Sequence, residues 1–237
     1  MLDRSQYGWR SAAPTHAHAY LVPAVLAALP PGRLRIVDLG SGNGFTARLL
    51  ADRGNEVVGV EPSVDGVAQS PSAIETAGAT ATETSPGSSR QAAGGSVRFV
   101  RASVYDDVAA VAGTGFDVAI STEVIEHLDR PRELFRAARS VLKPGGTLIV
   151  TTPHHGYLKN LAIALVDGWD RHHAVGWDGG HVKFFSVKTL SAMAAEAGFT
   201  GIRFRFAGRF PPLPKSMCLV ARAPAGVADG AGVARQG

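Results

Sequence analysis

The sequence predicts an α/β protein with a doubly wound, mostly parallel sheet. Short apolar runs alternate with segments that repeat apolar residues at helical spacing, which is the pattern of successive strand–helix units. The runs are almost continuously apolar, as in strands that are buried on both faces of a sheet. A glycine-rich stretch, DLGSGNGF at residues 38–45, directly follows the first run, as a turn from a first strand into a helix would.

The first half of the chain supplies four expected strands and a helix. The strand LRIVDL precedes the glycine turn, and the helical segment TARLLADRG follows it and ends at Gly54. The four strands are expected at residues 34–39, 56–62, 97–103 and 116–122. Alternation of this kind places helices on both faces of the sheet.

The second half supplies two helices and three further strands. Pro131 stands in the first turn of an amphipathic helix that ends at PGG, residues 144–146. Ser186 is the expected N-cap of another helix, which ends at Gly198. The strands are expected at residues 147–153, 201–208 and 216–223. The turn between the last two has no room for a helix, so one of these two strands should run antiparallel.

The chain is interpreted as one domain, residues 1–223, with two irregular segments. Residues 70–95 are rich in Ala, Ser, Thr and Gly, and we expect a mobile insertion because they offer little apolar surface to bury. Residues 224–237 are expected to be a disordered tail.

Composition favours a cytoplasmic protein. The single cysteine, Cys218, excludes an intramolecular disulfide and is interpreted as a small buried hydrophobe. The N-terminus lacks the apolar core of a secretory signal, and no stretch reaches the ~20 apolar residues of a membrane span. The net charge of +4 comes without a run of basic residues, so nucleic acid is not an expected partner.

The glycine stretch allows three readings: a phosphate loop, a dinucleotide site, or a tight turn without a ligand. A phosphate loop would continue with Gly-Lys-Ser/Thr, but Gly44 is followed by Phe45. A dinucleotide fingerprint would need a small residue at that same place, so the ring of Phe45 argues against NAD and FAD. Glu61 ends the second strand, where its carboxylate could accept hydrogen bonds from a ribose or simply be solvated. Asp38 ends an apolar strand, a costly place for a carboxylate unless it orders the loop or meets a cation.

Four segments in this order resemble the successive motifs of class I S-adenosylmethionine-dependent methyltransferases: VDLGSGNG, VVGVEP, FDVAISTEVIEHL and LKPGGTLIVTTP. The resemblance covers about residues 34–220, apart from the insertion. It implies a Rossmann-like methyltransferase fold with seven strands, of which the last is antiparallel. It also implies S-adenosyl-L-methionine as the cofactor.

The resemblance implies a location for each part of that cofactor. The glycine loop and Asp38 would border the methionine moiety, and Glu61 would bind the ribose. Many relatives carry an acidic residue near the adenine after the third strand, but this chain has Ser103 and Val104 there. The expected cofactor-binding residues are Asp38, Gly40, Ser41, Gly42, Gly44, Glu61, Ser103, Val104 and Thr122.

A second group of polar residues follows the fourth strand, in STEVIEHL. Glu123, Glu126 and His127 are spaced so that they would share one face of a helix. Two carboxylates and an imidazole at the carboxyl edge of the sheet could hold a metal ion. The alternative is that the two carboxylates stabilise a helix N-terminus and His127 is an ordinary partner.

This string is similar to the Glu-x-x-Glu-His string with which quinone-biosynthesis O-methyltransferases and plant-type small-RNA 2′-O-methyltransferases hold a divalent cation. The RNA enzymes add a histidine from a His-x-x-Phe segment, and His181 in HVKF stands at the matching place. The resemblance therefore implies a site for a cation such as Mg²⁺ on Glu123, Glu126, His127 and His181. The chain lacks the additional domains of the RNA enzymes.

The acceptor side is expected near the end of the fifth strand. His154 and His155 directly follow that strand and are, with His127, the candidate catalytic bases, because imidazole accepts a proton near neutral pH. They belong to a histidine-rich stretch, residues 151–185, that suits a polar pocket. The N-terminal stretch YGWRSAAPTHAHAY is interpreted as a lid over the cofactor, or else as a helix that only covers the sheet.

These observations predict an S-adenosylmethionine-dependent methyltransferase that acts on oxygen of a small hydroxylated molecule: a secondary metabolite, a sugar or a quinone-like compound. The alternatives are an RNA or other nucleic-acid 2′-O-methyltransferase and a cofactor-binding protein without catalysis.

Overall fold

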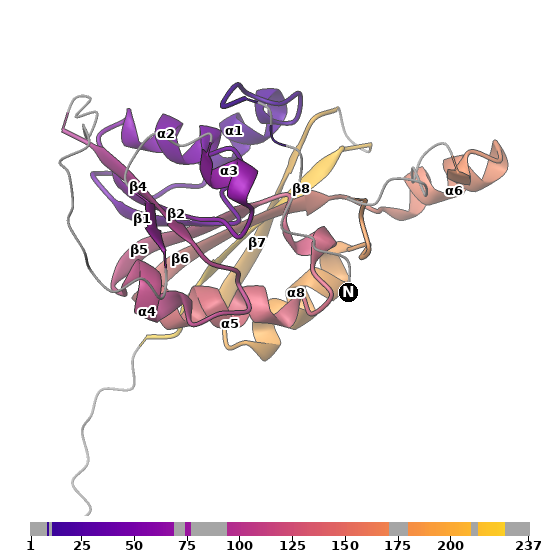
Figure 1. The fold of residues 1–237 in the computed structure, drawn as a ribbon. Coiled ribbons are helices and arrows are strands. Elements are labelled where there is room, and N and C mark those ends of the chain that lie inside the picture. The colour runs from indigo at the N-terminus through magenta and orange to yellow at the C-terminus, as the bar shows by residue number, and fades with distance from the viewer. Residues whose placement is uncertain are drawn as a thin grey trace, which may run out of the picture.

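Eight strands form one mixed sheet in the order β3-β4-β2-β1-β5-β6-β8-β7 (Figure 1). The computed structural model describes residues 9, 11–68, 74–76, 94–170, 180–209 and 213–225. The strands are β1 (Arg35–Leu39), β2 (Glu56–Val60), β3 (Ile74–Thr76), β4 (Ser96–Arg101), β5 (Phe116–Thr122), β6 (Leu142–Pro153), β7 (Thr200–Ala207) and β8 (Ser216–Arg222).

The predicted fold class is confirmed, including the direction of the last strand. β1 pairs in parallel with β2 and β5, and β5 pairs in parallel with β6. β8 runs antiparallel to both of its neighbours, β6 and β7. All seven predicted strands are present, and each lies within a few residues of its expected range.

An eighth strand lies inside the stretch expected to be irregular. β3 has only three residues and pairs in parallel with β4 at the edge of the sheet. Three residues are too short to leave a periodic pattern, so the Ala/Ser/Thr/Gly composition dominated the prediction. The rest of the expected insertion, apart from residues 94 and 95, and residues 226–237 of the expected tail lie outside the described residues.

Helices cover both faces of the sheet, as the alternating pattern predicts (Figure 1). On one face lie α1 (His18–Leu26), α2 (Phe45–Ala51) and α3 (Val64–Ala68). On the other lie α4 (Val108–Ala112), α5 (Arg132–Val141) and α8 (Val187–Glu196). The short α6 (Tyr157–Leu165) projects from the body and has no buried residue.

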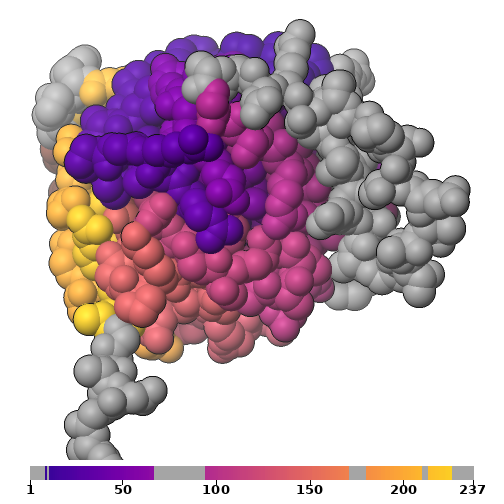
Figure 2. Space-filling view, turned by 90° about the vertical axis from the view of Figure 1, so that its left-hand side faces the viewer, coloured from indigo at the N-terminus to yellow at the C-terminus, as the bar shows by residue number. Residues whose placement is uncertain are grey.

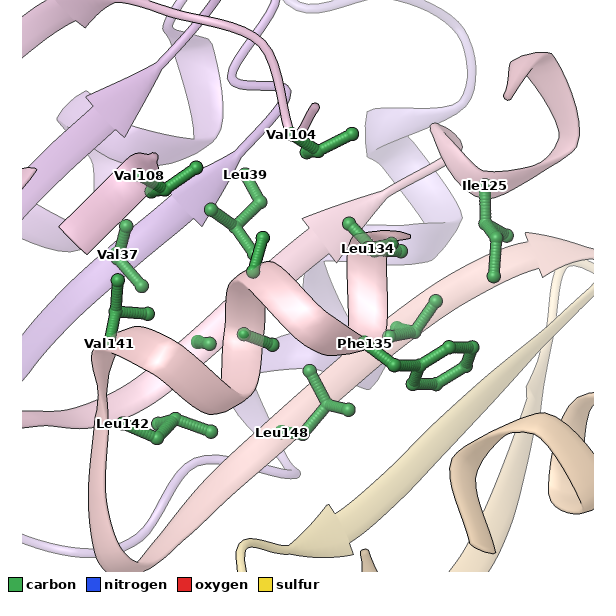
Figure 3. Close-up of a cluster of buried hydrophobic side chains, with 14 of the residues drawn as sticks. Val37, Leu39, Val104, Val108, Ile125, Leu134, Phe135, Val141, Leu142 and Leu148 are labelled. Carbon is green, nitrogen blue, oxygen red and sulfur yellow. The ribbon is translucent and has the colours of Figure 1, made fainter. Parts of the chain in front are cut away.

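Successive side chains along each strand point to opposite faces of the sheet, and this divides the hydrophobic core into two clusters. Val37 and Leu39 of β1 face the α4–α5–α8 layer, whereas Ile36 faces the α1–α2 layer. Figure 3 shows Val37 and Leu39 in one cluster with Val141 and Leu134 of α5. In Figure 2 the N-terminal part of the chain lies over the top of the molecule, above the strands and helices that follow it.

Helix ends follow local sequence rules. Ser186 caps α8 in a reciprocal pair with Thr189, as expected for an N-cap. α5 ends earlier than predicted, at Val141, because Leu142 is already extended and begins β6. Pro144, which cannot continue a helix, therefore lies near the start of a strand rather than at the end of a helix.

In the described part of the chain, no helix has the length and hydropathy that a membrane crossing requires.

Candidate active site

A cavity of about 460 Å³ opens at the carboxyl ends of the central strands, within the size range of small-ligand pockets. It extends from the ends of β2 and β4, past the glycine loop, to the end of β5 and one side of α1. Seven of the nine predicted cofactor residues line it: Gly40, Ser41, Gly42, Glu61, Ser103, Val104 and Thr122. Asp38 and Gly44 do not line it, because they lie behind the loop and at the start of α2.

The glycine loop needs glycine for both conformation and space. Gly40, Gly42 and Gly44 have φ values of +79°, +54° and +73°, in the left-handed region that side chains rarely adopt. A Cβ at Gly40 would lie 2.6 Å from a methyl carbon of Val124. The loop is anchored from below, where the amides of Gly40 and Ser41 donate to the carbonyl of Val60.

Glu61 is fixed at the wall of the cavity. One carboxylate oxygen accepts a 2.8 Å hydrogen bond from the Gly42 amide, and the other accepts from the amide and hydroxyl of Ser63. Burial raises the pKa of the Glu61 carboxyl above its ordinary value, although these hydrogen bonds oppose the shift. The oxygen that accepts from Gly42 has one acceptor site left, so the carboxylate can still accept a hydrogen bond from a ribose.

Asp38 is fully buried beneath the loop. Neither of its carboxylate oxygens has a hydrogen-bond partner within the described residues. Burial, and then repulsion from Glu61, raises the pKa of Asp38 to about 7. A buried carboxylate without a partner favours a nearby positive charge, which would offset its cost of desolvation.

The predicted helix across STEVIEHL is wrong. Only Ile125–His127 are helical, as a single 3₁₀ turn η1, and Glu123 is left-handed with φ of +53°. The Glu123 amide donates to both the carbonyl and the hydroxyl oxygen of Thr151, so β6 holds the chain in a turn here. The three side chains consequently do not share one helix face.

The structure brings together three of the four predicted metal ligands. Glu126, His127 and His181 each offer an atom within 4.8 Å of the others. Glu126 is 1% exposed, and one of its oxygens accepts from the Thr152 hydroxyl while the other lies 4.0 Å from Nε2 of His181. Burial, and then the charge of Glu123, raises the pKa of Glu126 well above its ordinary value.

Glu123 lies outside that group and faces the first residue of β8. The hydroxyl of Ser216 lies 3.4 Å from one Glu123 oxygen and donates to it. Burial raises the pKa of Glu123 to about 7. Because the residue also lines the cavity, its carboxyl group belongs to the wall at the β5 end.

Of the three candidate bases, only His127 lines the cavity. The rings of His154 and His155 pack edge-on against Phe206 and Phe184, with centroids 5.2 Å and 4.9 Å apart. Burial, and then Lys159, lowers the pKa of His154. Two further histidines of the stretch, at positions 172 and 173, lie outside the described residues.

A family described as "Methyltransferase domain" matches residues 10–203, most of the chain. The chain belongs to this methyltransferase family. The prediction of a class I methyltransferase related to quinone O-methyltransferases is thereby confirmed.

Similar proteins include two named ubiquinone biosynthesis O-methyltransferases. The one from Azorhizobium caulinodans is 29% identical over 171 residues, covering 70% of this chain and 58% of the relative. The one from Parvibaculum lavamentivorans is 31% identical over 169 residues, with the same coverage. A tRNA 5-carboxymethoxyuridine methyltransferase from Escherichia coli is 29% identical over 141 residues, covering 59% of this chain and 48% of the relative. The methyltransferase chain thus spans roughly half to three fifths of the length of such relatives.

Solved structures show the same fold at low identity. A S-adenosylmethionine-dependent methyltransferase from Thermotoga maritima, described as a possible histamine N-methyltransferase, has a TM-score of 0.57 and 19% identity, covering 87% of this chain and 89% of that one. A putative methyltransferase from Bacillus halodurans has a TM-score of 0.59 and 15% identity, covering 86% and 99%.

The site residues fit the cofactor of this family. The glycine loop lines the cavity at Gly40, Ser41 and Gly42, and Glu61 offers a carboxylate oxygen for a ribose. The unpartnered carboxylate of Asp38 suits the positive charge that a methionine moiety carries on its ammonium group.

The methyltransferase chain holds its N-terminal segment over the glycine loop, through contacts that the sequence did not reveal. The Asn43 amide donates to the carbonyls of Ser11 and Ala13, at 3.0 Å and 2.8 Å. The amide of Trp9 donates to Asp65, and the Trp9 ring lies beside Gly42. These contacts fit the predicted lid. The only sequence signal for them was Asn between two glycines.

Sequence reasoning also missed α1. Its segment HAYLVPAVL contains Pro23, which normally argues against a helix interior. Nevertheless His18, Leu21, Val22 and Val25 fall on one side of the helix and line the cavity.

Proposed function

We propose that the protein transfers a methyl group from S-adenosyl-L-methionine to an oxygen of a small hydroxylated molecule: a secondary metabolite, a sugar or a quinone-like compound. One observation carries the proposal: a single cavity joins the glycine loop and Glu61 to a second set of side chains at the end of β5 and on α1. Methyl transfer needs both reactants held side by side away from water.

In this proposal the chain's own residues bind the two reactants. When bound, S-adenosylmethionine supplies an activated methyl group. Glu61 would hold the ribose, Asp38 would balance the ammonium charge, and Ser103 and Val104 would flank the adenine. The glycine loop would bring backbone amides close to the ligand.

The acceptor hydroxyl must also lose its proton. We propose that the imidazole of His127 accepts this proton, because its ring lines the cavity. Nδ1 of the same ring lies 3.3 Å from the carbonyl of Gly180. His154 and His155 lie at the same edge of the sheet and are the second choice. A base in this position raises the nucleophilicity of the acceptor oxygen as the new bond forms.

A cation is a separate branch of the proposal. Glu126, His127 and His181 could hold a divalent ion, and one oxygen of the buried Glu126 has no hydrogen-bond partner among the described residues. Two imidazoles and a carboxylate suit Zn²⁺ or Mn²⁺ better than Mg²⁺, which prefers oxygen ligands. In this branch His127 would be a ligand, and the proton would pass to another group.

The experiment is methyl transfer from radiolabelled S-adenosylmethionine to a panel of catechols, sugars and quinols, with and without a chelator. Label in an oxygen-linked methyl group is the expected result. Full activity in excess chelator, with no metal in the purified protein, would reject the cation branch alone. Binding of S-adenosylhomocysteine without transfer to any acceptor in the panel would favour the non-catalytic alternative.

A second candidate function is methylation of RNA. It is favoured by the similarity to a protein named as a tRNA methyltransferase and by His181, which lies beside His127 with ring centroids 4.9 Å apart. Retention of unmodified tRNA on the immobilised protein at low salt, lost as salt rises, would support this candidate. A cytoplasmic location accompanies both candidates and is supported by the buried, unpaired Cys218.

A further inference from the structure

The two ends of the cavity differ in chemistry. Glu61 and Ser103 follow β2 and β4, on one side of β1 in the sheet order. Val124 follows β5, on the other side of β1, and α1 lies over that half of the sheet with contacts to β7 and β8. The glycine loop after β1 separates the two ends. Of the predicted cofactor residues that line the cavity, only Thr122 lies at the β5 end, so the α1 wall is left for another ligand.

The wall that α1 contributes is apolar except for one ring, whereas Glu123 and His127 line the cavity beside it on the β5 side. Leu21, Val22 and Val25 form the α1 wall, and Val124 and Leu128 line the cavity from the β5 side. His18, in the first turn of α1, is the polar member of this wall. An apolar surface with one polar group is typical of a site that orients a small, mostly apolar molecule.

Hydrogen bonds fix which nitrogen of His18 carries the proton. The backbone amide of Thr15 donates to Nδ1 at 2.7 Å, and a backbone amide can only donate. Nδ1 must therefore present its lone pair, and a neutral ring then carries its proton on Nε2. Burial lowers the pKa of His18, which keeps the ring neutral near pH 7. Within the described part of the chain, each hydrogen bond of this ring is made by Nδ1.

The aromatic ring of Phe45 packs against the imidazole ring of His18. The two ring centroids lie 4.6 Å apart with a tilt of 48°. Phe45 is the first residue of α2, directly after the last glycine of the loop. The bulky residue that excludes a dinucleotide fingerprint therefore has a role here, because it orients a histidine at the cavity.

We propose that the α1 end of the cavity binds the methyl acceptor, an uncharged and mostly apolar hydroxylated ring, and that His18 recognises it by donating from Nε2 to an acceptor oxygen. This inference rests on the proposed function. His18 acts as a specificity residue and does not take the acceptor's proton, because the nitrogen free to face a ligand already carries one. A carboxylate on the ring would be disfavoured, since the α1 wall offers it no cationic partner and the carboxyl of Glu123 lines the β5 side.

Binding measurements on the full chain test the proposal without requiring turnover. The affinity for S-adenosylhomocysteine is measured first by calorimetry. Catechol, and then its carboxylated analogue protocatechuate, is titrated into the S-adenosylhomocysteine-loaded protein. The variants are His18→Phe, which keeps a ring against Phe45, and His18→Gln, which keeps a donor. His16→Phe is the matched control, because His16 is exposed on the same segment and does not line the cavity.

We expect His18→Phe to raise the Kd for catechol about fivefold, the effect of one lost hydrogen bond, and to leave the Kd for S-adenosylhomocysteine within about twofold. His18→Gln should recover part of the loss, and His16→Phe should match the wild type. Catechol should bind more tightly than protocatechuate.

Each contrary outcome has a separate meaning. An equal loss of affinity for S-adenosylhomocysteine in His18→Phe would place His18 at the cofactor end and overturn the proposal. Tighter binding of protocatechuate, or no binding of catechol to the loaded wild type, would also overturn it. Failure of S-adenosylhomocysteine itself to bind would instead defeat the proposed function, and is seen in the first measurement.

Discussion

The backbone amide of Gly42 donates a 2.8 Å hydrogen bond to the carboxylate of Glu61. This bond joins the loop after β1 to the end of β2, two segments that are 19 residues apart. Gly42 is in the left-handed conformation, and its bond to Glu61 ties the loop to the end of β2. Loop conformation and the proposed recognition of the ribose therefore involve the same pair of residues.

Replacing Glu61 should weaken cofactor binding more than it weakens folding. Glu61→Ala removes the ribose acceptor and leaves the Gly42 amide without its partner. We expect a loss of about 1.5–3 kcal/mol, which is roughly 10- to 150-fold in the Kd for S-adenosylhomocysteine measured by calorimetry. Glu56→Ala, at the exposed start of the same strand, is the control and should bind as the wild type does. Equal affinities in both variants would remove Glu61 from the site.

The N-terminal segment should control how long the cofactor stays bound. Asn43→Ala removes both hydrogen bonds to the carbonyls of Ser11 and Ala13, and so loosens the segment that carries Trp9. We expect S-adenosylhomocysteine to dissociate about tenfold faster, as two neutral hydrogen bonds predict. Stopped-flow tryptophan fluorescence measures the rate, and Trp9→Phe identifies the signal of this residue.

Arg53→Ala supplies the control for that measurement, because Arg53 is exposed and its guanidinium donates to the Leu49 carbonyl of the preceding helix. It should leave the rate unchanged. If Asn43→Ala released the ligand at the wild-type rate, the segment would be a cover that does not gate the cavity.

Asp38 should make stability fall as pH rises. Its carboxyl has a pKa of about 7 in the folded chain, against an ordinary 3.8, because it is buried without a partner. The folded state therefore keeps a proton that the unfolded state releases between about pH 4 and pH 7. This stabilising contribution is complete below pH 4 and is lost as pH approaches 7.

The measurement is urea unfolding at several pH values, on the wild type and Asp38→Asn. The shift corresponds to a difference on the order of 4 kcal/mol between the two ends of the range. The amide of Asp38→Asn does not titrate, so its stability should decline less over the same range. If the stability of the wild type and of Asp38→Asn changed with pH in the same way, Asp38 would ionise normally in the folded protein.

The fold was predictable because its signals are local and repeated. Buried parallel strands leave continuous apolar runs, and Gly54 and Ser186 mark helix ends by chemistry that acts over a few residues. The proximity of the expected cofactor residues was predictable for the same reason. Gly40, Gly42 and Glu61 lie at strand ends that parallel pairing brings to one edge.

The proposed acceptor end was less predictable because it depends on contacts between distant segments. His18 gains its role from Phe45, 27 positions away, and from a helix that Pro23 concealed. The helical spacing of Glu123 and Glu126 suggested one shared face, but Thr151 of β6 holds Glu123 in a left-handed turn. Such tertiary contacts override local periodicity.

The packing of Phe135 in the hydrophobic core around α5 should contribute strongly to the free energy of unfolding. Phe135 is fully buried on α5, among side chains from the sheet and α8, and its ring centroid lies 6.3 Å from that of Phe199 (Figure 3). Phe135→Ala leaves a cavity that rigid neighbours cannot fill, so we expect a loss of about 3–5 kcal/mol in the free energy of unfolding by urea. Tyr157→Ala, at a side chain that is 78% exposed on α6, should change it by less than about 0.5 kcal/mol. A loss below about 1 kcal/mol at Phe135 would contradict the packing, because a fully buried ring cannot be removed so cheaply from a close-packed core.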